Sequence, residues 1–216
     1  NGKLGRLDAY ITGDDPDVAV LIVHDLLGWE TPNLRLLADH YAREVGATVY
    51  IPNIFDDGKL KKGKPDLNVF DQTEYGGCRG KISRERRHSE IAECARILRE
   101  DKRYKKVGAV GYGFGGPAVS ILSAKGVVDC ASITGPLGGL YVERRKVPVQ
   151  ILVAQHDEIE PAESILIIFK DLVNSMHLDI DFNYFAGVEQ DCFVHGDTGS
   201  KVEHEAMEKA RIAVVG

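Results

Sequence analysis

The stretch VGAVGYGFGGPAVS, residues 107–120, decides the fold of this chain. A run of β-branched and small apolar residues enters a glycine-dense turn, and the turn opens into a predicted helix. Two kinds of site use this shape: the phosphate-binding turn G-x-G-x-x-G, and the sharp elbow G-x-nucleophile-x-G of a covalent catalyst. In GYGFG the nucleophile position is Gly113, which has no side chain to attack a substrate. The stretch therefore predicts either a nucleotide-binding protein or a catalytic fold without its nucleophile.

The chain around this stretch alternates short apolar strands with longer amphipathic helices. Strands such as VAVLIV are apolar throughout, as expected of strands buried on both faces. Strands separated by helices predict right-handed crossovers and an α/β fold with a mostly parallel sheet and helices on both faces. The expected strands are Asp8–Thr12, Val18–Val23, Thr48–Ile51, Val107–Val110, Val127–Thr134, Val149–Ala154 and Ile180–Phe185. The expected helices are Asn33–Val45, Ser83–Glu100, Pro117–Ala124, Ala162–Met176 and Lys201–Val214.

Length and charge limit the domain count and the partners. The length of 216 residues allows one domain or at most two small ones, and we predict a single domain, residues 1–216, with one large core. The formal net charge of −6 argues against a nucleic-acid partner, because phosphate binding needs a basic surface. The basic segment KLKKGK at 59–64 lies in a long irregular stretch, 53–82, and is interpreted as part of a solvated loop. We expect a small-molecule ligand and a monomer or weak dimer.

Cysteine usage and hydropathy limit the compartment. The four cysteines are widely scattered without a C-x-x-C pair, which favours a reducing compartment over a disulfide framework. No His/Cys/Asp cluster has metal-ligand spacing, so we expect neither a metal site nor a cofactor. No apolar run reaches the roughly 18 residues needed to cross a membrane. No signal peptide is evident, although the chain starts at Asn1 without a methionine, which leaves a removed segment open. The default expectation is a cytoplasmic protein.

The candidate site residues follow the ends of the predicted strands. In an open parallel sheet, ligands bind beyond the carboxyl ends of the strands. That rule selects four clusters, at His24–Leu26, Tyr112–Phe114, His156–Glu158 and Gly187–His195.

The nucleotide interpretation has partial support. Gly111, Gly113 and Gly116 satisfy G-x-G-x-x-G after a strand, and Asp129 lies roughly where a ribose-binding carboxylate is expected. However, the motif lies in mid-chain rather than at the first strand–helix turn, and the helix after it is short. A chance match is also easy in a chain with 23 glycines, so this interpretation is the weaker one.

The whole chain resembles a known family of enzymes. The segments VLIVHDLLGWETPNLRLLADHYA, GYGFGG, LVAQHDEIEP and FAGVEQDCFVHGD resemble, in order and spacing, the dienelactone hydrolase family of α/β-hydrolases. The resemblance is closest to fungal and animal members and runs from about Gly5 to Val214. It implies an α/β-hydrolase fold and a small, usually cofactor-free hydrolase of lactones and esters with a Cys-His-Asp triad.

The resemblance places the family's triad on three positions of this chain. The nucleophilic cysteine falls on Gly113, and the acid falls on Asp157, which is retained. The histidine falls on Gln190, or on Asp191 if the register shifts by one. Two of the three chemical groups are therefore missing, and covalent catalysis in the family's manner is not expected.

Other parts of such a site do not depend on the missing side chains. The oxyanion hole of this fold uses backbone N–H groups, which the resemblance places at Leu26 and Phe114. Asp25 occupies the place of an acidic residue that pairs with the nucleophile in many family members. We therefore expect an anion-stabilising cradle with acidic groups around it.

Three further residue sets are candidates for the remaining chemistry. His24, beside Asp25, is either a general acid or base or a histidine hydrogen-bonded under its loop. Asp157 is either a carboxyl group with a raised pKa and a new acid–base role, or an ion-paired residue without a catalytic role. The third candidate is a new pair of a cysteine and a histidine, formed by Cys192 and His195 in the loop that carries the family's histidine.

The candidate site residues fall into two groups. The candidate catalytic residues are Asp157, His24 and Asp25. The candidate substrate-binding residues are Leu26, Trp29, Tyr112, Gly113, Phe114, Gln190, Asp191 and Cys192, of which the aromatic ones are equally consistent with core packing.

Three functions remain open at this point. The first is a relative of dienelactone hydrolases that binds a small carbonyl or lactone compound and performs cofactor-free cyclisation, isomerisation or dehydration, with fungal relatives implying secondary metabolism. The second is an ester or lactone hydrolase that uses activated water. The third is a non-catalytic binding protein.

Overall fold

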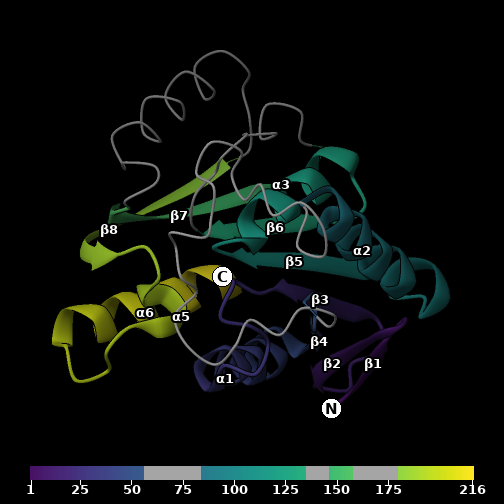
Figure 1. Ribbon diagram of the computed structural model, residues 1–216, viewed down its shortest axis with the longest axis horizontal. Helices are drawn as coiled ribbons and strands as arrows, with labels where there is room; N and C mark the ends of the chain where they lie inside the picture. Colours follow the sequence, from purple (N-terminus) through teal and green to yellow (C-terminus); the bar gives the residue numbers. More distant parts are fainter. Residues whose placement is uncertain (56–83, 135–145, 158–179) are drawn as a thin grey trace.

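The computed structural model describes residues 1–55, 84–134, 146–157 and 180–216, and the fold is built on one eight-stranded sheet (Figure 1). The order of the strands across the sheet is β1-β2-β4-β3-β5-β6-β7-β8. Their bounds are Gly2–Leu4 (β1), Leu7–Thr12 (β2), Val18–Val23 (β3), Thr48–Pro52 (β4), Lys106–Tyr112 (β5), Cys130–Thr134 (β6), Val149–His156 (β7) and Ile180–Glu189 (β8).

The sheet is parallel except at one edge. Strands β1 and β2 run antiparallel to their neighbours, whereas every pairing from β4 through β8 is parallel. The predicted mostly parallel sheet is therefore confirmed. The carboxyl ends of β3, β5, β7 and β8 consequently lie along one edge of the sheet, which brings the described residues of the four predicted clusters to that edge. Glu158, the last residue of one cluster, lies outside the described residues.

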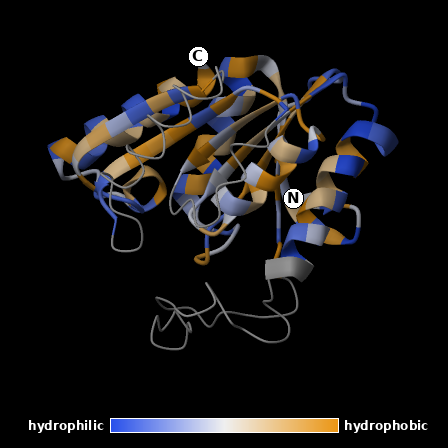
Figure 2. Ribbon diagram, turned by 90° about the horizontal axis from the view of Figure 1, so that it is seen from above, coloured by the Kyte–Doolittle hydropathy of each residue, from blue (hydrophilic) through white to orange (hydrophobic). Residues whose placement is uncertain are grey.

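Helices cover both faces of the sheet. Their bounds are Pro32–Tyr41 (α1), Ala42–Gly46 (the π-helical turn η1), Arg84–Arg96 (α2), Ile97–Asp101 (the π-helical turn η4), Gly115–Lys125 (α3), Cys192–His195 (α5) and Lys201–Val215 (α6). One core lies between the sheet and α2 and α3, and the other lies between the sheet and α1, α5 and α6 (Figure 1). Apolar residues are concentrated along the strands in Figure 2, as this double covering requires.

The glycine-dense turn allows α3 to pack unusually close to the sheet. A Cβ atom on Gly115 would lie only 2.1 Å from the backbone oxygen of Val23, so no larger residue fits there without moving backbone. Seven of the residues that open α3, Gly115 to Leu122 except Ile121, are buried. A Cβ atom on Gly111 would likewise lie only 2.6 Å from the backbone oxygen of Gly115. Close packing therefore explains one of the three glycines of the nucleotide-like motif.

Several element boundaries differ from the predicted ones. Strand β1, at Gly2–Leu4, was not predicted, because three residues are too short to show a pattern. Strand β6 begins at Cys130 rather than Val127, and β8 continues four residues beyond Phe185 to Glu189. The short helix α5 was not predicted either. The predicted helix Ala162–Met176, the segment KLKKGK and most of the predicted loop 53–82 lie outside the described residues.

The described part of the chain contains no helix long and apolar enough to cross a membrane. Within the same ranges, no group of three or more His, Cys, Asp or Glu residues could hold a metal ion. Cys94, Cys130 and Cys192 are free thiols, and Cys78 lies outside the described residues.

Candidate functional site

The turn between β5 and α3 has the geometry of a nucleophile elbow. Gly113 has a φ of +49°, in the left-handed region that favours glycine. Its N–H donates to the backbone oxygen of Thr134 at 3.1 Å, and its own oxygen accepts from the N–H of Gly116 at 3.0 Å. A Cβ atom built on Gly113 would lie 3.1 Å from the Cβ atom of Asp25. A side chain at the nucleophile position would therefore project directly onto Asp25.

A small cavity lies where that side chain would stand. Its volume is about 80 Å³, which is enough for a few water molecules or for the reactive end of a small molecule. The lining residues come from the ends of β3, β5, β6 and β8 and from α5. They are Asp25, Tyr112, Gly113, Thr134, Gln190, Asp191, Phe193 and Val194.

The Asp25 carboxylate is fixed by two hydrogen bonds. Its Oδ1 atom accepts from the backbone N–H of Leu27 at 2.8 Å, and its Oδ2 atom lies 2.5 Å from Nε2 of His195. Both side chains of the Asp25–His195 pair are largely shielded from solvent, at 17% and 15% exposure. Burial lowers the pKa of His195, but the hydrogen bond and the charge of Asp25, with a smaller contribution from Asp191, outweigh it and raise that pKa above its ordinary value.

The two predicted backbone donors, Leu26 after β3 and Phe114 in the elbow, each follow a residue that lines the cavity but are not lining residues themselves. The N–H groups of Leu26 and Phe114 have no hydrogen-bond acceptor among the residues that the structure describes. Phe114 immediately precedes α3, so the positive end of that helix dipole adds to its N–H group. These groups suit an oxygen atom that gains negative charge during a reaction.

His24 lies beneath the site rather than in it. Its side chain is fully buried, its Nδ1 atom lies 2.6 Å from the backbone oxygen of Asp25, and its Nε2 atom lies 3.4 Å from the backbone nitrogen of Ile54. A neutral ring with its proton on Nδ1 satisfies both contacts, and burial lowers the pKa of His24. The geometry corresponds to the hydrogen-bonded alternative that the sequence left open, and it favours a role in holding the loop that carries Asp25.

The positions expected to replace the family histidine lie at the cavity. Gln190 and Asp191 both line it, and the N–H of Gln190 donates to the backbone oxygen of His156 at 2.9 Å. That hydrogen bond holds Gln190 beside His156, the last residue of β7, and Asp157 is the next residue in the chain. Asp157 is half-buried there and interacts with other residues, and its catalytic role stays a prediction.

Cys192 does not form the alternative couple with His195. Cys192 is the first residue of α5 and is only 1% exposed, with its side chain in the core. Burial raises the pKa of its thiol to about 12. His195, three residues further on, is paired with Asp25 instead. This pairing was missed from the sequence, because Asp25 and His195 are 170 positions apart and no local pattern connects them.

The predicted aromatic residues have different surroundings. Tyr112 lines the cavity, and its hydroxyl lies 2.6 Å from that of buried Tyr41. Phe114 packs edge-on against Phe55, with ring centroids 5.2 Å apart. Trp29 is not among the residues that line the cavity, and its ring stacks with the guanidinium of Arg35 at 5.0 Å.

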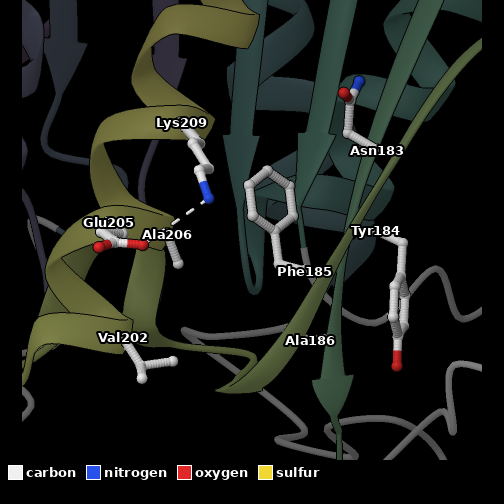
Figure 3. A pocket seen from close by; sticks show the side chains of 8 residues that line it. All are labelled: Asn183, Tyr184, Phe185, Ala186, Val202, Glu205, Ala206 and Lys209. Atoms are coloured by element: carbon white, nitrogen blue, oxygen red, sulfur yellow. Dashed lines mark ion pairs between the residues drawn. The ribbon is translucent and has the colours of Figure 1, made fainter.

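A larger hollow of about 460 Å³ lies between β8 and α6 (Figure 3). Phe185 and Lys209 point into the space between the two elements, and the Lys209 ammonium lies 3.9 Å from a carboxylate oxygen of Glu205. None of the predicted site residues lines this hollow. The smaller cavity at Gly113 is therefore the candidate site, since it alone of the two adjoins the elbow and Asp25.

The arrangement of a parallel sheet, an elbow after β5 and an acidic residue after β7 defines an α/β-hydrolase. The chain matches the dienelactone hydrolase family over residues 7–215 and therefore belongs to that family.

Comparisons with individual proteins agree with this assignment. The chain is 26% identical over 207 residues to the human "Carboxymethylenebutenolidase homolog", covering 90% of this chain and 81% of that protein. It is 27% identical over 213 residues to "Hydrolase tropI" of Talaromyces stipitatus, covering 96% and 83% of the two chains.

Solved structures show the same fold at low sequence identity. A putative dienelactone hydrolase from Klebsiella pneumoniae has a TM-score of 0.71 at 13% identity, over 94% of this chain and 90% of that one. The dienelactone hydrolase-like promiscuous phosphotriesterase P91 from metagenomic libraries has a TM-score of 0.67 at 15% identity, over 98% and 93%.

Proposed function

We propose that this chain binds a small carbonyl or lactone compound at the Gly113 cavity and transforms it by proton transfer, without a cofactor and without a covalent enzyme intermediate. One observation carries the proposal: the elbow is intact, but the position of the nucleophile is a glycine whose missing side chain would project onto Asp25. Nucleophilic attack from position 113 is excluded by the residue itself, whereas a carboxylate beside the cavity supports acid–base chemistry.

The first step uses Asp25, which lines the cavity, and two backbone N–H groups that follow the lining residues Asp25 and Gly113 in the chain. A substrate carbonyl oxygen accepts from the N–H groups of Leu26 and Phe114, while Asp25 takes a proton from the carbon next to the carbonyl group. The electron pair of the broken C–H bond moves onto the carbonyl oxygen and gives an enolate. Positioned proton transfer of this kind contributes on the order of 10²–10⁴ in rate.

The fate of the enolate defines the reaction class. Return of the proton from Asp25 at another carbon gives isomerisation. Loss of a β-hydroxyl group, which takes that proton and leaves as water, gives dehydration. Attack of the enolate carbon on a second carbonyl group, whose oxygen takes the proton, gives cyclisation. Gln190 and Asp191 border the cavity and are placed to orient a polar group of the substrate. None of these outcomes needs a nucleophile at position 113.

A second candidate is hydrolysis of an ester or lactone by water. The cavity has room for water beside Asp25, and a carboxylate can activate water as a general base. This reaction gives a hydroxy acid or an acid and an alcohol, and it shows no burst of covalent enzyme. Retention of the cavity for binding alone is the remaining alternative.

Proton NMR in D₂O with small α,β-unsaturated lactones and β-hydroxy ketones tests the proposal and separates the three functions. We expect deuterium at the carbon next to the carbonyl group, or an isomerised or dehydrated product, in the presence of the native chain. Asp25→Asn removes the base and should abolish the change, whereas Asp8→Asn, at a surface ion pair with Lys3, should not. A hydroxy acid as the sole product supports the hydrolytic alternative, and unchanged substrate contradicts an enzymatic role toward these compounds.

A further inference from the structure

The Asp25–His195 pair joins two segments that the fold fixes independently. Asp25 follows β3, and its backbone oxygen is held by buried His24. His195 ends α5, where its backbone N–H donates to the oxygen of Asp191 at 2.8 Å. The two side chains therefore meet between anchored backbones rather than on mobile loops.

Helix α5 is short, but its inner side is firmly packed. Cys192, Phe193 and Val194 are each at most 2% exposed, and the ring of Phe193 packs edge-on against Phe185 with centroids 5.0 Å apart. With these side chains in the core, α5 cannot rotate without breaking that packing. The orientation of His195 is consequently set by the core.

The order of the groups is the reverse of that in a hydrolase triad. In a triad the imidazole meets the substrate and the carboxylate holds the imidazole from behind. Here Asp25 lines the cavity and His195 does not, so the carboxylate is the group that meets a ligand. The Nδ1 atom of His195 has no hydrogen-bond partner among the described residues, which leaves Asp25 as the one group that His195 holds there.

We infer that His195 is the positioning residue of Asp25: its Nε2–H group and the N–H of Leu27 hold one carboxylate oxygen each and fix the carboxylate toward the Gly113 cavity. This inference deepens the proposed function and rests on it. A carboxylate held in one orientation is ready to accept a proton, whereas a free one must first be ordered. His195 does not touch the substrate in this arrangement.

Steady-state kinetics on a substrate turned over by the native chain test the inference. His195→Phe keeps a ring but removes the donor, and we expect kcat to fall roughly 10- to 100-fold with KM changed less than about twofold, within the contribution of a positioned base. His195→Gln keeps an N–H donor and should recover most of the loss. His40 is the matched control, because its Nδ1 atom lies 2.8 Å from Glu44 on the surface, and His40→Phe should leave both constants unchanged.

NMR titration of the His195 imidazole tests the pairing without any turnover. The charged groups around it are Asp25 after β3, Asp191 before α5 and Glu203 of α6, which lies near Gly196. Asp25→Asn should lower the titration midpoint of His195, and Asp8→Asn should not. Thermal unfolding of each variant confirms that it folds.

The two proposals fail differently. Absence of any turnover by the native chain contradicts the proposed function. Turnover that survives His195→Phe, loss that His195→Gln does not relieve, or a His195 midpoint unmoved by Asp25→Asn contradicts the positioning role while leaving the proposed function standing.

Discussion

The Nε2 atom of His195 lies 2.5 Å from the Oδ2 atom of Asp25, at the edge of the cavity that Gly113 leaves open. The contact joins the end of β3 to the end of α5. Among the described residues that line or support the cavity, it is the one contact between an imidazole and a carboxylate.

This contact predicts a pH dependence of stability. The pKa of His195 is raised in the folded state, so its stabilising contribution is fully present below its unfolded value, about 6.5, and is lost as the pH rises through the raised folded value. The free energy of unfolding, measured by urea denaturation between pH 5.5 and 8.5, should therefore fall more steeply with rising pH for the native chain than for His195→Gln. Parallel curves for the two proteins would show that the contact does not form.

The left-handed backbone at the elbow predicts the cost of adding a side chain. Gly113→Ala should destabilise the fold by about 1–3 kcal/mol, because φ is +49° and the new Cβ atom would lie 3.1 Å from that of Asp25. Gly46→Ala is the control: φ there is +66°, but nothing lies within 4 Å of the added atom. Urea denaturation should show a larger loss at position 113, and equal losses would mean that the contact with Asp25 costs nothing.

The buried hydroxyl pair behind the cavity predicts a non-additive double mutant. The hydroxyl groups of Tyr41 and Tyr112 lie 2.6 Å apart, and both residues are buried. Tyr41→Phe alone leaves the Tyr112 hydroxyl without its partner and should cost about 1–3 kcal/mol, whereas Tyr41→Phe/Tyr112→Phe should lie closer to the native stability. Additive losses in denaturation experiments would contradict the mutual hydrogen bond.

Thiol chemistry distinguishes two buried cysteines from an exposed one among the three cysteines in the described part of the chain. Burial raises the pKa of both Cys94 and Cys192 to about 12, so neither has an appreciable thiolate fraction near neutral pH. The pKa of Cys130 is also raised, chiefly by burial of its thiol, but the residue is exposed on β6 and can be reached by a reagent. Iodoacetamide followed by peptide mass spectrometry should modify Cys130 in the folded chain and the other two only after unfolding. Rapid modification of Cys192 with loss of activity would instead support the couple of Cys192 and His195.

The fold could be predicted well from the sequence because its strongest signals are local. Apolar runs such as VAVLIV give β3 at the predicted bounds, Val18–Val23, and the strand–glycine–helix pattern gives β5 and α3. The four clusters at the strand ends followed from a rule about sheet topology alone. Short elements such as β1 and α5 were missed, since three or four residues carry no periodicity.

The candidate site was predicted only in part, because pairing and burial depend on tertiary structure. Asp25, Gly113, Gln190 and Asp191 come together at one cavity as the strand ends suggested. His24 stands beside Asp25 in the sequence but points beneath the loop, whereas His195, 170 positions away, reaches the carboxylate. No local pattern in the sequence distinguishes these two histidines.

The most direct test of the account is the hydrolysis of dienelactone and of an activated ester by four proteins side by side. They are the native chain, Gly113→Cys, Gly113→Cys/Gln190→His and Gly113→Cys/Asp191→His, the last two covering both positions at which the family histidine falls. We predict background hydrolysis without a burst for the native chain, and a gain of hydrolysis with a covalent burst in at least one double variant. Fast native hydrolysis with a covalent burst would contradict the account, because it would require a nucleophile that position 113 does not supply.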